Sequence, residues 1–398
     1  MFAGWRDRKH ERDLRLATEL LSEGDHLMTR GSWVKAEQAF RWAVDLRCDR
    51  LGAEAGLTLE ARSRLAVALI GLSRREEAEA ELRDLVVCCP AVLGEDHGLT
   101  SDVRIDLANL LVRKNRLDDA MELALAVLRC RPAPDEFGLM AWGTKLRVYA
   151  AQGRHREAAD EAQTLREQNA QVYGENHIRT LKAGADRVQN LVFLGEYETA
   201  ERECRALIDQ HGKQDQLWLA VMNALILALN GLGRHDQAET AARKALKQEA
   251  RITKPGGDWR VVLGLGLARS LSGRGHHEEA LRVASQATAE ALRSPGVRVS
   301  LMAPIATVTA RALLGLERLE DAEAEARRAV ELAEPNLSPI HHSFLEAATT
   351  LGSVLAAQNR RAEAEEQLTR CATAWREHFG PHHPRTVAIE AELATLRS

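Results

Sequence analysis

Histidine is the residue type in this sequence that most invites a chemical role. The chain has 14 histidines, and three pairs are adjacent: His276–His277, His341–His342 and His382–His383. Adjacent side chains on a helix point about 100° apart, whereas two ligands of one metal ion on a helix are usually three or four residues apart. His378 and His382 have that spacing, but Gly380 and Pro381 would break a helix between them. We therefore expect no metal site.

Sequence motifs for nucleotide binding and nucleophilic catalysis are missing. No Gly-x-x-x-x-Gly-Lys loop, Gly-x-Ser-x-Gly turn or His-Glu-x-x-His motif occurs. Gly264 and Gly266 begin a dinucleotide-binding pattern, but Arg269 stands where its third glycine would be. The six cysteines form no Cys-x-x-Cys pair, and we interpret them as reduced, packed side chains. We expect neither catalysis nor a cofactor.

Composition narrows the class of partner. The 54 Lys and Arg against 58 Asp and Glu give a net charge of −4, so no basic field draws the chain to nucleic acid or anionic lipid. The most apolar window, residues 217–229, is shorter than the roughly 20 residues that span a bilayer. The chain begins without the apolar stretch of a secretory signal. We expect a cytoplasmic protein, and 45 Arg against 9 Lys is typical of a GC-rich bacterial genome.

One sequence pattern recurs along the whole chain: a turn residue, a few mostly polar residues and an alanine. The step between these anchor alanines is constant, except that it is shorter before Ala158 and before Ala238. Apolar or small residues upstream of each anchor, such as Leu65, Ala66 and Leu69, share one helical face. Each unit is thus a helix–turn–helix pair that buries its apolar face by stacking on its neighbours. The anchors are Ala36, Ala78, Ala120, Ala158, Ala200, Ala238, Ala280, Ala322 and Ala364.

This pattern resembles the tetratricopeptide repeat over almost the whole chain. The usual step, as from Ala36 to Ala78, and the connectors at 93–100, 173–180 and 379–386 are similar to a subfamily found in kinesin light chains, and similar arrays are attached to bacterial signalling ATPases. The resemblance implies an all-α fold, a right-handed superhelical solenoid of about nine helix pairs whose upstream helices line an inner groove. We expect His97 and His177 of the connectors to hydrogen-bond to the start of the following helix.

The chain has no linker rich in Gly, Ser or Pro, so one continuous array is expected. We expect a loose, charged lead-in at residues 1–10, the repeat array at 11–383 and a capping helix at 384–398 that shields the last apolar face.

Partner chemistry is expected on one stripe of the upstream helices, at the positions that Asp102, Ile105, Asn109 and Val112 hold in the third repeat. The stripe is acidic and apolar in its N-terminal third and carries amides and cations further on. Amides can both donate to and accept from a peptide backbone, and arginine grips carboxylates through two hydrogen bonds. The stripe therefore predicts an acidic or C-terminal-carboxylate peptide lying against residues 109–269. The candidate binding residues are Asn109, Arg147, Lys182, Gln189, Asn223, Asn230, Arg269 and Arg311.

Two charged residues, Lys145 and Arg187, stand at stacking positions that leucine normally holds. A buried unpaired charge is costly, so these side chains must reach solvent, meet an acid such as Asp186 or Glu157, or open a pocket. The surrounding segment, 143–189, is the expected ligand region.

Two functions of different classes remain open on the sequence. The first is a non-catalytic protein- or peptide-binding scaffold or adaptor in bacterial signalling, including the sensor half of a nucleotide-binding regulator. The second is an enzyme or small-molecule-binding protein with a cavity enclosed by the superhelix, formed by residues 143–230. A deep pocket with convergent polar groups would favour the second, and an open groove the first. Self-association through either end of the array also remains open.

Overall fold

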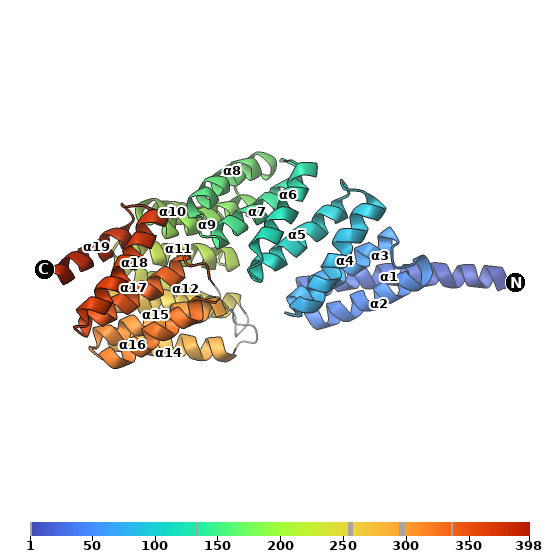
Figure 1. The fold of residues 1–398 in the computed structure, drawn as a ribbon. Helices are drawn as coiled ribbons and strands as arrows, with labels where there is room; N and C mark the ends of the chain where they lie inside the picture. The colour runs from blue at the N-terminus through green and yellow to red at the C-terminus, as the bar shows by residue number, and fades with distance from the viewer. Residues whose placement is uncertain (1, 133, 254–257, 294–298, 336) are drawn as a thin grey trace. The chain divides into compact units, whose positions relative to one another are not determined.

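The fold consists of helices throughout the part of the chain that the computed structural model describes, residues 2–132, 134–253, 258–293, 299–335 and 337–398. Within the described residues, nine consecutive helix pairs are followed by a single closing helix, which confirms the all-α repeat fold (Figure 1). The helices are α1 (Phe2–Thr29), α2 (Trp33–Leu51), α3 (Gly56–Gly71), α4 (Arg75–Leu93), α5 (Gly98–Arg113), α6 (Leu117–Cys130), α7 (Glu136–Ala151), α8 (His155–Tyr173), α9 (Ile178–Phe193), α10 (Tyr197–His211), α11 (Gln216–Gly231), α12 (His235–Ile252), α13 (Asp258–Gly273), α14 (His277–Arg293), α15 (Val299–Gly315), α16 (Leu319–Ala333), α17 (His342–Ala357), α18 (Arg361–Phe379) and α19 (Pro384–Arg397).

Residues 2–10 correct one expectation. They form the first turns of α1, where the sequence predicts a loose lead-in. None of the described helices combines the length and the apolarity needed to cross a bilayer.

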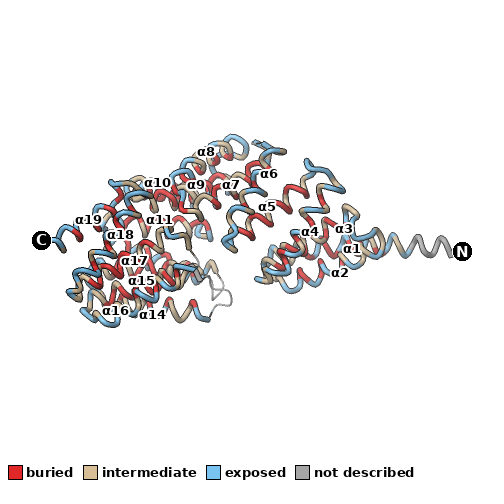
Figure 2. The backbone as a smooth tube through the Cα atoms, in the orientation of Figure 1, coloured by how far each residue is buried: buried red, intermediate tan, exposed pale blue. Residues whose placement is uncertain are grey.

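The anchor alanines lie where the two helices of each pair meet. All nine have no exposed surface. A larger side chain at that point would push the two helices apart. Figure 2 colours the buried parts of the helices red. The turn before each anchor needs a residue with positive φ, which Gly195 supplies at +75° and Asn115 at +58°. The predicted helix–turn–helix unit is therefore observed.

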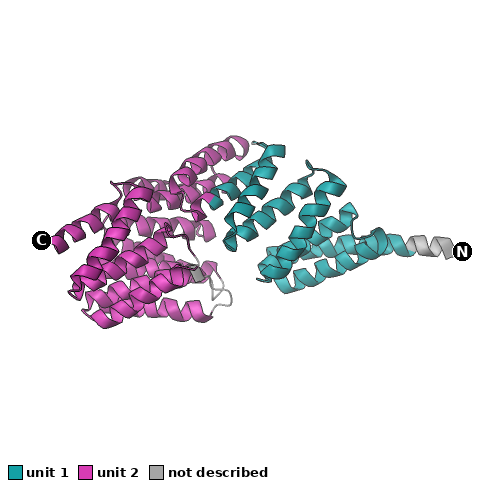
Figure 3. Cartoon of the chain, viewed as in Figure 1, with its two compact units in different colours: residues 1–148 teal, residues 149–398 magenta. Residues whose placement is uncertain are grey.

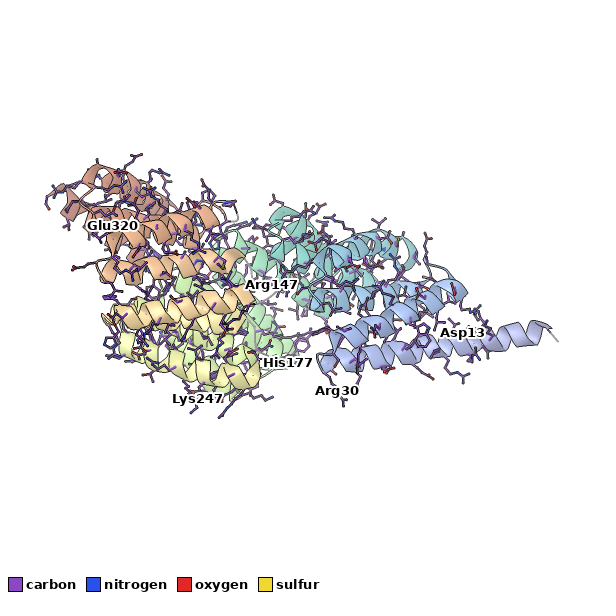
Figure 4. The ribbon with its side chains drawn as sticks, turned by 90° about the horizontal axis from the view of Figure 1, so that it is seen from below. Asp13, Arg30, Arg147, His177, Lys247 and Glu320 are labelled. Carbon is purple, nitrogen blue, oxygen red and sulfur yellow. The ribbon has the colours of Figure 1, made fainter. Side chains whose placement is uncertain are left out.

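The connectors fix the start of the next helix through a histidine. Nδ1 of His97 accepts a hydrogen bond from the Leu99 amide at 3.1 Å, and Nδ1 of His177, labelled in Figure 4, accepts one from the Arg179 amide at 3.3 Å. Both bonds confirm the predicted capping role. The two shorter connectors use an aspartate instead, since Asp135 and Asp215 accept the corresponding amide hydrogen bonds.

Charges on the outer helices are more ordered than the scattered, solubilising pattern that the sequence suggests. Arg116, which precedes α6, pairs with Glu79 of α4 at 3.0 Å, and Arg234, which precedes α12, pairs with Glu201 of α10 at 2.7 Å. The same pairing recurs elsewhere along the chain, so each of these repeats is tied to the one before it. Lys247 of α12 and Glu320 of α16, by contrast, are exposed (Figure 4).

The chain divides into two compact units, residues 1–148 and 149–398 (Figure 3). The boundary lies inside α7 and not at a linker. The sequence, by contrast, predicts one continuous array. Each unit has its own core. In unit 1 the core includes Phe40, Leu82 and Leu110, and in unit 2 it includes Leu219, Ile226 and Leu263.

Candidate ligand cavity in the second unit

Unit 2 contains a cavity of about 780 Å³, a size that accommodates a small organic molecule or a short peptide. Its wall comes mainly from the first helices of successive pairs, α9, α11, α13, α15 and α17, and from α19. The sequence places the first helices of the pairs, but not α19, along the inner groove.

Unit 2 closes on itself around this cavity, because its first and last repeats are in contact. Nε2 of His378 lies 3.1 Å from the carbonyl oxygen of Gly153, 225 residues earlier. Nε2 of His383 lies 3.2 Å from the carbonyl oxygen of Phe193, 190 residues earlier. Nδ1 of His383 accepts the Arg385 amide at 3.1 Å, so its Nε2 carries the proton and donates to Phe193.

The closing contact is aromatic, with Trp375 and His383 buried and Phe193 and His342 half-buried. The ring of His342 stacks on Phe193 with centroids 3.9 Å apart, and Trp375 stacks on His383 at 4.9 Å. Burial lowers the pKa of His341 and of His383 to about 4 and also lowers the pKa of His342. These imidazoles are therefore neutral at neutral pH.

Four charged side chains from different helices meet in the wall of the cavity. Glu346 of α17 accepts hydrogen bonds from Arg269 of α13 at 2.8 Å and from Arg385 of α19 at 2.9 Å. Arg311 of α15 donates from Nε to Oγ1 of Thr350 at 3.1 Å. Three guanidinium groups thus surround one carboxylate, and the cluster has a net positive charge.

The electrostatics of the cluster follow from this imbalance. Burial would raise the pKa of Glu346, but the positive charges of Arg269, Arg385 and Arg311 outweigh burial and hold that pKa well below its usual range. Burial, together with repulsion from Arg385, lowers the pKa of Arg311 to about 10, although Glu346 opposes the shift. The cation of Arg311 is therefore the least compensated of the three.

Several polar atoms in the cavity wall have no hydrogen-bond partner in the described structure. They are buried, and buried polar atoms in folded proteins are almost always paired. A bound polar ligand would supply the missing partners. The unpaired atoms are Nε of Arg269, Oγ of Ser272, Nδ1 of His277 and Nδ1 of His342.

The cavity brings together five of the eight candidate residues from the sequence. Arg269 and Arg311 belong to the charged cluster, and the amides of Gln189 and Asn223 face the same space. Asn230 also lines the cavity, but its amide already donates to Gly266 and Ser270, and its oxygen lies 3.1 Å from Nδ1 of His235. Whether these side chains bind a ligand stays a prediction.

The other three candidates lie outside the cavity lining. Oδ1 of Asn109 accepts from Nη2 of Arg147, labelled in Figure 4, at 2.7 Å, and both residues belong to unit 1. Lys182 is exposed on α9. Of the two charges at stacking positions, Arg187 pairs with Glu203 at 3.0 Å and not with Asp186 or Glu157, while Nζ of Lys145 lies 6.0 Å from the ring centroid of Trp142.

Two members of the charged cluster are absent from the candidate residues. Glu346 occupies the first position of the inner stripe in the last repeat, although the sequence analysis describes only the N-terminal third of the stripe as acidic. Arg385 lies at the end of the last connector and the start of α19, a helix expected only to cap the array. Among the described residues, no group of three or more His, Cys, Asp or Glu side chains is placed to hold a metal ion.

Comparisons with known proteins agree with this architecture. Two sequence models, both described as tetratricopeptide repeat, match the chain, one at residues 58–98 and 344–385 and the other at residues 219–244 and 261–286. No curated protein matches the sequence.

Solved structures with a similar fold have low sequence identity to this chain. A Rap protein complexed with Competence and Sporulation Factor is 12% identical, with a TM-score of 0.54 over 85% of this chain and 99% of that one. A protein with the same repeat from Parabacteroides merdae is 15% identical, with a TM-score of 0.50 over 73% and 99%. Repeats of a putative kinesin light chain from Podosopora anserina are 17% identical, with a TM-score of 0.44 over 50% and 96%. At these identities the likeness is one of fold alone.

Proposed function

We propose that this chain, which is a tetratricopeptide repeat protein, is a non-catalytic binding protein whose second unit holds the carboxylate-bearing end of a peptide in its cavity. Arrays of this repeat generally mediate protein–protein interaction, and they do so through the surfaces of stacked helices. The observation that carries the proposal is the presence of three arginines, Arg269, Arg311 and Arg385, in the lining of one cavity whose single carboxylate bonds to two of them.

The remaining lining supports a peptide. The amides of Gln189 and Asn223 can each donate and accept, which suits a peptide backbone of any sequence. Apolar residues between these amides and the arginines, such as Val262 and Leu265, would contact side chains. The Rap neighbour, described in complex with a factor, is a precedent for ligand binding by this fold. The arginine-rich composition supports a bacterial origin, and we place the protein in cytoplasmic signalling or regulation.

The test compares short peptides that differ only at the C-terminus. A pool of fluorescent pentapeptides with free carboxylates and a pool with amidated ends are titrated against the protein by fluorescence polarisation. We expect the free-carboxylate pool to bind and the amidated pool to bind at least about tenfold more weakly, because a charge-assisted bond is lost. An Arg269→Gln/Arg311→Gln variant should lose the difference. The control Arg361→Gln, which alters an exposed arginine of the same unit, should keep it.

Equal binding of both pools would reject the carboxylate-binding role. Binding that persists in the double variant would move the site elsewhere on the molecule.

Small-molecule binding is the second candidate function, favoured by the limited volume of the cavity. Native mass spectrometry of the purified protein tests it directly. A retained species of small-molecule mass, lost in the Arg269→Gln/Arg311→Gln variant, would favour this reading over the peptide.

A further inference from the structure

We infer that the positive end of the cavity takes a head group with two negative charges, a phosphomonoester or a dicarboxylate, carried on an apolar body. The inference rests on the proposed function, since it names the class of ligand for the same cavity. It goes further by requiring a second negative charge at the head group that the proposed function gives as a carboxylate.

The charge balance of the lining is the first argument. Among the lining residues, the charged side chains are Arg269, Arg311, Arg385 and Glu346. One oxygen of Glu346 accepts from Arg269 and the other from Arg385, so both are used. Counted over the lining alone, a ligand with one negative charge would leave one positive charge uncompensated, and a ligand with two negative charges would leave none.

One acid outside the lining offsets part of the charge of Arg311, although burial raises the pKa of that acid. Glu392 of α19 interacts electrostatically with Arg311, but it lies outside the cavity lining and accepts a hydrogen bond from Oγ of Ser353 at 3.0 Å. In the described structure, Arg311 has one hydrogen bond, from its Nε to Thr350. The two terminal nitrogens of its guanidinium are therefore available to a ligand.

The available donors are the second argument. Nε of Arg269 is buried without a partner in the same lining as the terminal nitrogens of Arg311, and guanidinium groups match the paired oxygens of phosphate and carboxylate groups. A phosphomonoester offers three acceptor oxygens, and a dicarboxylate offers four. Either group can satisfy more of these donors than one carboxylate can.

The remaining lining residues indicate the chemistry of the rest of the ligand. Apolar side chains from three helices line it, namely Leu227 of α11, Val262 and Leu265 of α13, and Val308 and Leu314 of α15. Oγ of Ser272 and Nδ1 of His277 are unpaired in the same wall and would bond one hydroxyl or amide group of the ligand. The ligand is thus amphiphilic, with charge at one end.

Three probes with the same aromatic body test the inference. Benzoate carries one charge, phthalate carries two as a dicarboxylate, and phenyl phosphate carries two as a phosphomonoester at about pH 8. Each is titrated into the full-length protein by isothermal calorimetry at fixed ionic strength. We expect at least one of the doubly charged probes to bind about tenfold more tightly than benzoate. The probe that binds more tightly shows whether the head group is a dicarboxylate or a phosphomonoester.

Two variants check that the preference comes from Arg311. Arg311→Gln should remove it, whereas Arg311→Lys, which keeps the charge, and Arg361→Gln, on an exposed arginine, should retain it. Circular dichroism confirms that each variant folds. Benzoate binding as tightly as both dianions would overturn the inference and leave the proposed function standing. Failure of all three probes and of the free-carboxylate peptides would overturn both.

Discussion

Glu346 accepts a hydrogen bond from Arg269 at 2.8 Å, which ties a carboxylate of α17 to α13, 77 residues earlier in the chain. Its other oxygen accepts from Arg385 at the start of α19. One acidic side chain therefore links three inner helices. Because it is the one carboxylate of the described lining, it also sets how much positive charge the cavity presents to a ligand.

Replacement of this carboxylate should separate ligand binding from stability. Glu346→Gln removes a negative charge from the cavity, so phenyl phosphate should bind several-fold more tightly by calorimetry. The free energy of unfolding should fall by about 2–4 kcal/mol, because two buried guanidinium groups lose their counter-charge. Loss of both affinity and stability would mean that Glu346 matters to the site only by holding its shape.

The positive charge of Arg311 should destabilise the protein when no ligand is bound. Burial and the neighbouring arginines lower its pKa to about 10, which shows that its charge is unfavourable where it lies. Arg311→Met keeps most of the length of the side chain without the charge, and it should raise the free energy of unfolding by about 1–3 kcal/mol in urea denaturation. A destabilised Arg311→Met variant would show that the hydrogen bond to Thr350 outweighs the unfavourable charge.

Unit 2 should lose stability as the pH falls from about 6.5 to 4. His341 and His383 have pKa values of about 4 in the folded state and 6.5 when exposed, so the unfolded chain binds more protons in this window. Stability is complete above pH 6.5 and declines as the pH falls, at up to about 2.7 kcal/mol per pH unit for two protons. Urea denaturation at a series of pH values measures the slope.

Removal of one closing histidine provides the matched comparison. His383→Asn should reduce the slope of the unfolding free energy against pH by about 1.4 kcal/mol per pH unit, the contribution of one proton. His276→Asn, which alters an exposed ring, should leave the slope unchanged. A slope that is the same in all three proteins would mean that other groups cause the acid sensitivity.

The contact that closes unit 2 can be tested at a turn. Gly195 has a φ of +75°, and a Cβ atom there would lie 2.5 Å from Cδ of Pro384. Gly233 has a φ of +71° in the turn between α11 and α12, with nothing within 4 Å of the added atom. Asparagine tolerates positive φ, as Asn115 and Asn359 show in the same kind of turn.

Gly195→Asn should therefore destabilise unit 2 by about 1–3 kcal/mol more than Gly233→Asn, and it alone should weaken phenyl phosphate binding. Denaturation and calorimetry of the two variants provide the comparison. Equal effects would show that the contact between the first and last repeats contributes nothing to the cavity.

The periodic features of this fold could be predicted from the sequence because each depends on residues within one repeat. The fully buried anchor alanines and the histidine caps at His97 and His177 are of this kind. The pairs between outer helices, such as Glu79 with Arg116, also repeat in step with the anchors, so the sequence carries their signal.

The cavity could be predicted only in part. Inner-stripe residues of adjacent repeats lie close enough to form hydrogen bonds with each other. Asn109 and Arg147, which the sequence predicts as ligand-binding residues, therefore bond to each other. The closing contact joins His383 to Phe193 across 190 residues. No periodic pattern encodes that contact, because it results from the accumulated curvature of all the repeats between them. Arg385 enters the site through this contact.

The most direct test of the central claim is to observe the arginine side chains while a ligand binds. Protein labelled with ¹⁵N-arginine is titrated with phenyl phosphate, and the Nε–H signals are assigned by substitution. The account predicts that the signals of Arg269, Arg311 and Arg385 shift together and saturate, while that of exposed Arg361 does not move. Absence of any saturable shift in those three signals, or equal shifts in Arg361, would contradict an anion site in the cavity of unit 2.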